Sequence, residues 1–281
     1  MSLTRALEEQ EVSSELRRIY GEVRTSLDLP FVPTLFKLLA GTPEYLKLMW
    51  DDLSQVACSS EFHGAARALE EFVRSLVVKG GWRFSDPRKV LAAQKFSVDD
   101  MDVIGNLPPV FTRTLCQMSL FSRLIQLGYA GGQRGRVSEA RQAAALARVM
   151  SLNIPNERDA GLRVWLIYVD IKKATGARHV LSLFRVLSPF PGYLASVWLD
   201  SKKVMADAGF SQARDQVGKR VQGLGFGLPV KDHRAAGKQI EPARWREVEE
   251  TVDGIARVLP LFTLLSAVWQ RSVAHLQSAA A

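Results

Sequence analysis

The sequence is poor in the residues on which disulfide frameworks, metal centres and thiol chemistry depend. Its 281 residues include only two cysteines and four histidines. Cys58 and Cys116 lie far apart in apolar helical patterns, which favours buried free thiols in a reducing cytoplasm over a disulfide. The histidines show neither HxxxH nor HExxH spacing, and the sequence has no C-x-x-C or G-x-S-x-G motif. We therefore expect no metal site and no cofactor.

Long apolar runs are also missing. No run reaches the roughly 18 residues that a transmembrane helix needs, and the densest, VLPLFTLLSAVW at 258–269, predicts a core helix. The N-terminus is polar and acidic and has no apolar stretch typical of a signal peptide. We expect a cytoplasmic protein without a membrane span.

Positive charge is abundant but not concentrated. The net charge is +8 and the isoelectric point is near 9.7, yet the basic residues are dispersed along the chain. The densest basic segment, GGQRGRVSEARQ at 131–142, is typical of a solvated linker. The sequence has no zinc-finger, RRM or KH signature. These observations argue against a nucleic-acid partner.

One segment of the chain is written twice. Residues 19–52 recur without gaps, 148 positions later, as residues 167–200, with eleven identities in 34 positions where chance would give about two. Pro43 and Pro191 each predict the start of a helix. The shared apolar residues follow the i, i+3, i+4, i+7 spacing of one helix face. They are Val32, Leu35, Phe36 and Leu39 in the first copy and Val180, Leu183, Phe184 and Leu187 in the second.

The similarity fades downstream, but the order of the predicted elements persists. Ser97 and Asp100 have the spacing of a capping box ahead of an apolar stretch, and Pro242 suits the first turn of a helix at the corresponding place. A Leu-Pro pair recurs at 107–108 and 259–260. Each copy therefore continues into a further long helix.

Alternating apolar patterns typical of strands are scarce, so we predict an all-α fold. Two fused helical repeats, 1–130 and 159–281, are joined by a linker at 131–158. Repeats this alike usually pack about a pseudo-twofold axis. We therefore expect a pseudo-dimer with a central pocket between the repeats.

Two acid–aromatic pairs recur in the copies, Tyr20 with Glu22 and Tyr168 with Asp170. A catalytic carboxylate is one interpretation. Repetition in both copies favours a hydrogen-bonded packing feature instead.

The duplicated strings IYGEVRTSLDLPFVPTLFKLLAGTPEYLKLMW and IYVDIKKATGARHVLSLFRVLSPFPGYLASVW, with their Pro-x-Tyr-Leu turns, resemble the group I 2-haloacid dehalogenases. These are also called the halocarboxylic acid dehydrogenase family, and the resemblance covers nearly the whole chain. It implies an all-α pseudo-dimer around a pocket, and removal of halide from both enantiomers of short 2-haloacids. It also implies that an Asp deprotonates the water that displaces halide, and that an Asn helps to hold this water.

This chain departs from the family pattern at both polar positions. The resemblance places the Asp between a Ser and a Phe, where the chain has Leu183, and leucine cannot accept a proton. The Asn would precede a proline, where the chain has Leu107, and Asn106 is one residue away. The ligand-binding residues implied by the resemblance are Phe31, Thr34, Leu107, Ser182, Leu183, Val258, Leu259 and Phe262.

Three functions remain open on the sequence. The first is a dehalogenase-like protein that binds a small hydrophobic or carboxylate-bearing molecule without ordinary dehalogenation. The second is a hydrolytic 2-haloacid dehalogenase that uses another carboxylate, Asp170 or Glu22, as the base, with Asn106 as a candidate partner. The third is a structural or interaction protein with a basic surface. A homodimer is a further expectation from the resemblance.

Overall fold

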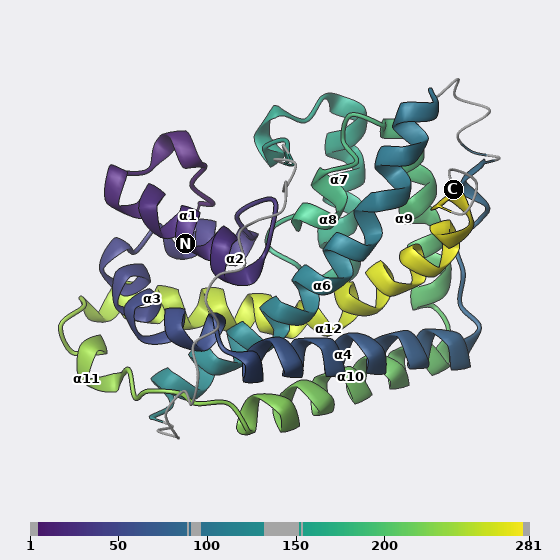
Figure 1. The fold of residues 1–281 in the computed structure, drawn as a ribbon. Helices are drawn as coiled ribbons and strands as arrows, with labels where there is room; N and C mark the ends of the chain where they lie inside the picture. Colours follow the sequence, from purple (N-terminus) through teal and green to yellow (C-terminus); the bar gives the residue numbers. More distant parts are fainter. Residues whose placement is uncertain (1–4, 89, 91–96, 132–151, 153, 278–281) are drawn as a thin grey trace. The chain divides into compact units, whose positions relative to one another are not determined.

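The computed structural model describes residues 5–88, 90, 97–131, 152 and 154–277, and over these residues the chain is built from helices without a strand (Figure 1). This confirms the all-α prediction. The α-helices are α1 (Ser14–Leu27), α2 (Thr34–Leu39), α3 (Pro43–Ala57), α4 (Ser60–Gly80), α6 (Val98–Tyr129), α7 (Leu162–Thr175), α8 (Ser182–Arg185), α9 (Pro191–Met205), α10 (Ala208–Phe226), α11 (Arg234–Gly237) and α12 (Pro242–Gln277). Two 3₁₀ turns, η1 (Glu9–Glu11) and η2 (Glu157–Asp159), precede α1 and α7.

Local chemistry sets several helix starts, as the sequence predicted. Helices α3 and α9 begin at Pro43 and Pro191, and α12 begins at Pro242, because proline has no N–H to leave unpaired in a first turn. A capping box closes the start of α6. Its two bonds run from Ser97 N to Asp100 Oδ2 and from Asp100 N to Ser97 Oγ, each at 3.1 Å.

The chain divides into two compact units. Unit 1 consists of Met1–Ala68, Gln117–Asn153 and Val221–Arg257, and unit 2 of Leu69–Cys116, Ile154–Arg220 and Val258–Ala281. Helices α4, α6, α10 and α12 each contribute residues to both units.

The two units are defined by contacts between residues, whereas the two repeats are defined by similarity of sequence. The repeat boundaries at 1–130 and 159–281 and the pseudo-dimer stay predictions. Most of the predicted linker lies outside the described residues, at 132–151 and 153.

Unit 1 is organised around Phe36 of α2. Its ring meets Trp50 of α3 edge-on, with centroids 5.8 Å apart, and lies 5.2 Å from the ring of Phe121 of α6. The indole N–H of Trp50 donates to Glu22 Oε2 of α1 at 2.8 Å. Aromatic packing and one hydrogen bond thus fix α1 against α3.

Unit 2 repeats this arrangement with the residues 148 positions later. The ring of Phe184 of α8 meets Trp198 of α9 edge-on at 5.7 Å, and it lies 5.9 Å from Phe262 of α12. The indole N–H of Trp198 donates to Asp170 Oδ2 of α7 at 2.7 Å. The recurring acids are therefore hydrogen-bonded packing features, as the sequence favoured.

Most of the longest apolar helix is buried. An 18-residue window within Pro242–Ala274 of α12 is apolar enough to cross a membrane, with a mean hydropathy of 1.5, and 72% of that window lies inside the protein. A helix buried to this extent is typical of the core of a soluble protein. The absence of a membrane span stays a prediction.

Candidate functional site

Leu183 lies in α8, the single-turn helix of unit 2. The chain enters this turn through Leu181 in an extended conformation, and Leu181 O accepts the first helical bond from Phe184 N at 3.0 Å. The Leu183 side chain is 3% exposed. An apolar residue thus fills the position where the family resemblance implies a catalytic carboxylate.

The other predicted ligand-binding residues are buried, and the structure divides them between the units. Phe31 and Thr34 belong to unit 1. In unit 2, the ring contact between Phe184 and Phe262 brings α8 together with α12. The remaining predicted residues of unit 2 are Leu107, Ser182, Val258 and Leu259. The binding role of all these residues stays a prediction.

Asn106 does not join this buried set. Its side chain is exposed on α6, and its amide Nδ2 donates to the carbonyl of Asp102, one turn earlier in the same helix, at 2.9 Å. An exposed amide of this kind holds no water inside a pocket.

Asp170 is held by two donors at the protein surface. Its Oδ2 accepts the Trp198 indole N–H, and Lys202 Nζ lies 2.7 Å from the same oxygen. These bonds, that with Lys202 first, lower the pKa of Asp170 below its usual value. A water-activating base in an apolar cavity needs the opposite, a raised pKa, so Asp170 lacks the mark of such a base.

Glu22, the counterpart of Asp170 in the first copy, is also engaged on both oxygens. Arg18 of α1 pairs with Oε1, and Trp50 donates to Oε2. Its side chain is partly exposed. These contacts join α1 to α3, so the Glu22 carboxylate has a structural role.

Asp200 is a buried acid that sequence reasoning missed. Its carboxylate in α9 accepts from Ser85 N at 2.7 Å and lies 3.0 Å from Lys203 Nζ. Glu8, the second buried acid among the described residues, pairs with Lys37, which is itself buried. Both buried carboxylates are therefore neutralised by donors.

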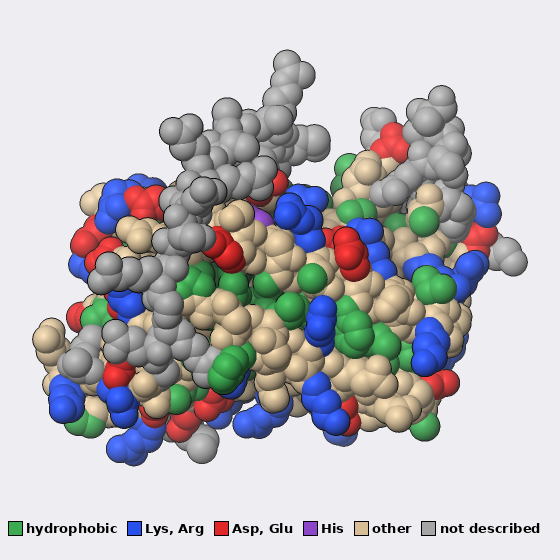
Figure 2. Space-filling view, turned by 60° about the horizontal axis from the view of Figure 1, so that its bottom comes forward, with side chains coloured by type: hydrophobic (Ala, Val, Ile, Leu, Met, Phe, Trp, Pro, Cys, Tyr) green, Lys and Arg blue, Asp and Glu red, His purple; other side chains and the backbone are tan. Residues whose placement is uncertain are grey.

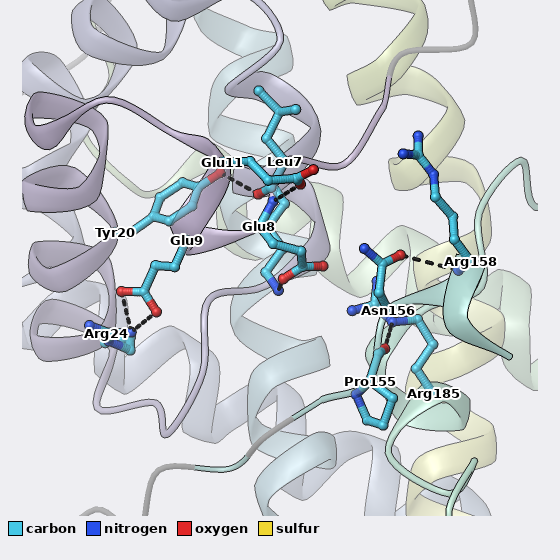
Figure 3. A network of polar contacts seen from close by, with 11 residues as sticks. Leu7, Glu8, Glu9, Glu11, Tyr20, Arg24, Pro155, Asn156, Arg158 and Arg185 are labelled. Carbon is cyan, nitrogen blue, oxygen red and sulfur yellow. Dashed lines mark hydrogen bonds and ion pairs between the residues drawn. The ribbon is translucent and has the colours of Figure 1, made fainter.

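Turns η1 and η2 are 148 residues apart and so correspond in the repeat of the sequence. The hydrogen bonds around the two turns differ (Figure 3). In unit 1, Tyr20 donates its hydroxyl to the carbonyl of Leu7 at 2.9 Å. In unit 2, Arg185 Nε donates to the carbonyl of Pro155 at 3.0 Å, and Asn156 Oδ1 accepts from Arg158 N at 3.2 Å.

His233 is a second group that the sequence did not single out, because it stands alone in a loop before α11. It is fully buried in unit 1, and its Nε2 lies 3.4 Å from Asp52 Oδ2 without hydrogen-bonding geometry. Its ring packs against Gly128, where a Cβ would approach Nδ1 to 2.6 Å. Burial lowers the pKa of His233, and the imidazole is neutral near pH 7.

Both cysteines are free, as the sequence predicted, although Cys58 is half-buried rather than buried. Cys116 is buried, and burial raises the pKa of its thiol well above the ordinary value, which makes it a poor nucleophile. Among the described residues, no group of three or more His, Cys, Asp or Glu side chains is placed to hold a metal ion.

Residues 30–184 match the family described as Halocarboxylic acid dehydrogenase DehI, which is more than half of the chain. The chain belongs to this family. The DehI-family match spans α2 to α8, and so includes Leu183.

Similar proteins carry dehalogenase names. An (R)-2-haloacid dehalogenase of Pseudomonas putida is 20% identical over 290 residues, covering 99% of this chain and 93% of that protein. A solved D-2-haloacid dehalogenase with L-LA superimposes with a TM-score of 0.87 at 17% identity, covering 97% of each chain. A mutant D-2-haloacid dehalogenase with D-2-CPA gives a TM-score of 0.85 at 17% identity over 97% of this chain and 96% of that one. These structures share the fold of this DehI-family protein.

Proposed function

We propose that this DehI-family protein binds a small hydrophobic or carboxylate-bearing molecule and does not carry out ordinary 2-haloacid dehalogenation. The observation that carries the proposal is Leu183, buried at the position of the family's implied base. Hydrolytic displacement of halide needs a basic group that takes a proton from water. A leucine side chain has no such group. The binding residues would be the buried apolar set of unit 2 around α8 and α12.

The contacts of the remaining acids support this proposal. A base of the required kind would be buried, with few donors and a raised pKa. The pKa of Asp170 is lowered, and the buried Glu8 and Asp200 are paired with cations. The alternative hydrolase would need one of these acids, or Glu22, to leave its partners before accepting a proton.

The distribution of basic side chains on the surface gives little support to an interaction role. On the face drawn in Figure 2, Lys and Arg side chains are scattered among other side chains and do not gather into one patch. Dispersed charge gives weak, salt-sensitive attraction to polyanions rather than a defined site.

The test of the lost base is halide release from D- and L-2-chloropropionate. The wild type is compared with two variants. Leu183→Asp places a carboxylate at the implied base position, and Leu183→Asn has a side chain of the shape of aspartate that cannot act as a base. We expect no halide release from the wild type or from Leu183→Asn. Halide release by the wild type would refute the proposal and direct the search to Asp170 and Glu22.

Leu183→Asp buries a carboxyl group, so circular dichroism and melting curves must first confirm that both variants are folded. Activity in folded Leu183→Asp alone would mean that the binding residues persist and only the base is missing. Inactivity in both variants would favour a pocket that has diverged further.

The binding half of the proposal is tested separately, by melting curves of the wild type with propionate, 2-chloropropionate and longer carboxylates. A ligand present at 100 times its Kd stabilises the folded state by about 2.7 kcal/mol. A melting temperature unchanged by every compound up to 10 mM would contradict small-carboxylate binding while leaving the halide result untouched.

A further inference from the structure

The short helices α2 and α8 each bury one basic side chain at the same place in the repeat. Lys37 of α2 is 7% exposed, and Arg185 of α8, 148 residues later, is 2% exposed. In unit 1, Lys37 pairs with the carboxylate of Glu8, the residue that precedes the first residue of η1. A buried cation is tolerated when an anion is placed beside it. Unit 1 supplies this anion from its own chain.

The corresponding residue of unit 2 carries no charge. Asn156 precedes η2 at the position of Glu8, and its side chain is one methylene shorter. Its Oδ1 accepts from Arg158 N at 3.2 Å, so this oxygen is turned towards η2 itself (Figure 3). Arg185 Nε donates to the carbonyl of Pro155 at 3.0 Å. Unit 2 therefore has an amide where unit 1 has the carboxylate of Glu8.

The next acid of unit 2, Glu157, repeats a different contact of unit 1. Its Oε1 lies 2.6 Å from Lys172 Nζ, and 148 residues earlier Glu9 pairs with Arg24 in the same way. Its Oε2 accepts from Val180 N at 3.0 Å. Glu157 is thus the counterpart of Glu9, and it does not take over the role of Glu8.

The tyrosine hydroxyls of the two units also differ in their partners. In unit 1, Tyr20 donates to the carbonyl of Leu7. In unit 2, the corresponding carbonyl, that of Pro155, accepts from Arg185, and the Tyr168 hydroxyl is left without a hydrogen bond. Tyr168 is 1% exposed. A buried hydroxyl without an acceptor costs free energy, which a bound acceptor would recover.

Each of these tyrosines lies close to the charged groups of its unit. Burial raises the pKa of Tyr20, and the charge of Glu8 raises it further. Burial also raises the pKa of Tyr168, whereas the side chain of Ser188 and the charge of Arg185 oppose this rise. Ser188 lies near the hydroxyl without hydrogen-bonding geometry. The buried hydroxyl and the buried guanidinium of unit 2 are therefore neighbours.

We propose that Tyr168 and Arg185 form a binding site for a small carboxylate, which takes in unit 2 the place of the Glu8 carboxylate in unit 1. Arg185 supplies charged N–H donors in the geometry that carboxylates prefer, and Tyr168 donates its hydroxyl. A guanidinium has five N–H donors, so Arg185 can bind the ligand in addition to its contacts within the protein. Leu183 lies about 200° round the axis of α8 from Arg185, so the site is on the other side of this helix and does not rest on the proposed function.

Charge around the site favours an anion. Burial lowers the pKa of the half-buried His179, and the nearby charges act on it in both directions. Glu157 raises this pKa, whereas Lys172, Arg178 and Arg185 lower it. Three cations and one acid thus lie in this part of unit 2, which gives a positive potential.

The experiment titrates the ¹⁵N-labelled full-length protein with sodium acetate up to 50 mM at pH 7.5 and follows it by NMR. Sodium chloride is exchanged for acetate, so that the ionic strength stays constant. We expect a Kd on the order of 1 mM, because a ligand of so few atoms binds weakly. Tyr168→Phe should weaken binding about tenfold. Asn156→Glu places the carboxylate of unit 1 in unit 2 and should abolish binding.

The matched control is Tyr20→Phe, which removes the corresponding hydroxyl of unit 1. It breaks the bond to Leu7, so its melting temperature should fall, while its Kd for acetate should stay within about twofold of the wild type. Tyr168→Phe should show the reverse, a melting temperature within about 2 °C of the wild type and a weaker Kd. Equal weakening of acetate binding in both variants would overturn the proposal.

The other contradicting results are equally direct. A wild type without shifts up to 50 mM acetate, a Tyr168→Phe variant with the Kd of the wild type, or a folded Asn156→Glu variant that still binds acetate would each overturn the site. Asn156→Glu also separates this site from the proposed function. Stabilisation by 2-chloropropionate that persists in Asn156→Glu would come from the residues around Leu183, whereas acetate binding that is lost there belongs to Arg185 and Tyr168.

Discussion

The two copies of the repeated element share their aromatic packing and differ at the surface and around the 3₁₀ turns. In each copy the phenylalanine of the short helix meets a tryptophan of the next helix edge-on. The ring centroids are 5.8 Å apart in unit 1 and 5.7 Å apart in unit 2. Each ties its first helix to its third through an indole N–H and an acid 28 residues earlier. The shared features are those that packing demands, and the unshared ones lie at the surface and at the 3₁₀ turns.

The comparison extends to the position where the family resemblance implies a base. The counterpart of Leu183 in unit 1 is Leu35, and both leucines are buried. The counterpart of Ser182 is Thr34, also buried. At the position where the family resemblance implies a chemical difference between the copies, this chain has the same apolar residue in both.

The largest expected difference between the units concerns Glu8. Its carboxylate neutralises the buried Lys37 in unit 1, whereas the equivalent position in unit 2 holds Asn156. Glu8→Gln keeps an acceptor for the cap of η1 but leaves a buried ammonium group without its counter-charge. We expect a loss of about 3 kcal/mol in the free energy of unfolding, measured by urea denaturation.

The control for this prediction is Asn156→Ala, which removes only a side-chain cap and should cost about 1 kcal/mol. Equal losses from the two variants would mean that the buried ion pair gives unit 1 no distinct stabilisation.

A smaller effect should be common to both units. Trp50→Phe and Trp198→Phe each keep an aromatic ring and remove the N–H that an acid accepts. Each acid keeps a cationic partner, Arg18 or Lys202, so we expect each variant to lose about 1 kcal/mol in stability by thermal unfolding. A loss confined to one variant would break the equivalence of the two packing motifs.

The smallest effect should appear in acid, through His233 of unit 1. Burial lowers the pKa of this imidazole, so as pH falls the unfolded chain takes up a proton first, near pH 6.5. The stabilisation is complete above that pH and declines as pH falls from about 6.5 towards the lower folded-state pKa. We expect the melting temperature to drop between pH 7.5 and 5.5, and to drop less in His233→Gln.

Burial also lowers the pKa of His179 of unit 2, so this histidine adds to the drop. The double variant His179→Gln/His233→Gln should therefore flatten the dependence of the melting temperature on pH more than His233→Gln alone. A melting temperature that falls with pH as steeply in His233→Gln as in the wild type would remove His233 from the explanation.

Local signals in the sequence predicted the helix class and several boundaries. Pro43, Pro191 and Pro242 begin helices because their backbone preference acts within one turn. Val32 and Val180 precede α2 and α8, because the chain is extended at the residue before each helix. The helices therefore begin two residues later than the apolar pattern predicts. Burial of these valines was nevertheless expected from the apolar pattern.

Contacts between distant residues could not be predicted from one sequence. The pairing of Glu8 with Lys37 joins residues 29 positions apart, and the bond from Ser85 to Asp200 spans 115 positions. Neither has a local pattern that distinguishes it from a solvated charge. Leu183 could be singled out only through the family resemblance, because a buried leucine in an apolar helix is common.

The composition of the units has a consequence for how the protein is made on the ribosome. Unit 1 begins with the first 68 residues but needs residues 221–257 to be complete. At a synthesis rate of about 5–20 residues per second, the gap of roughly 150 residues lasts on the order of ten to thirty seconds. During that interval α1, α2 and α3 lack the residues from 221 to 257 that complete their unit. The nascent chain thus carries an unfinished core until its last helix emerges, when both units become complete almost together.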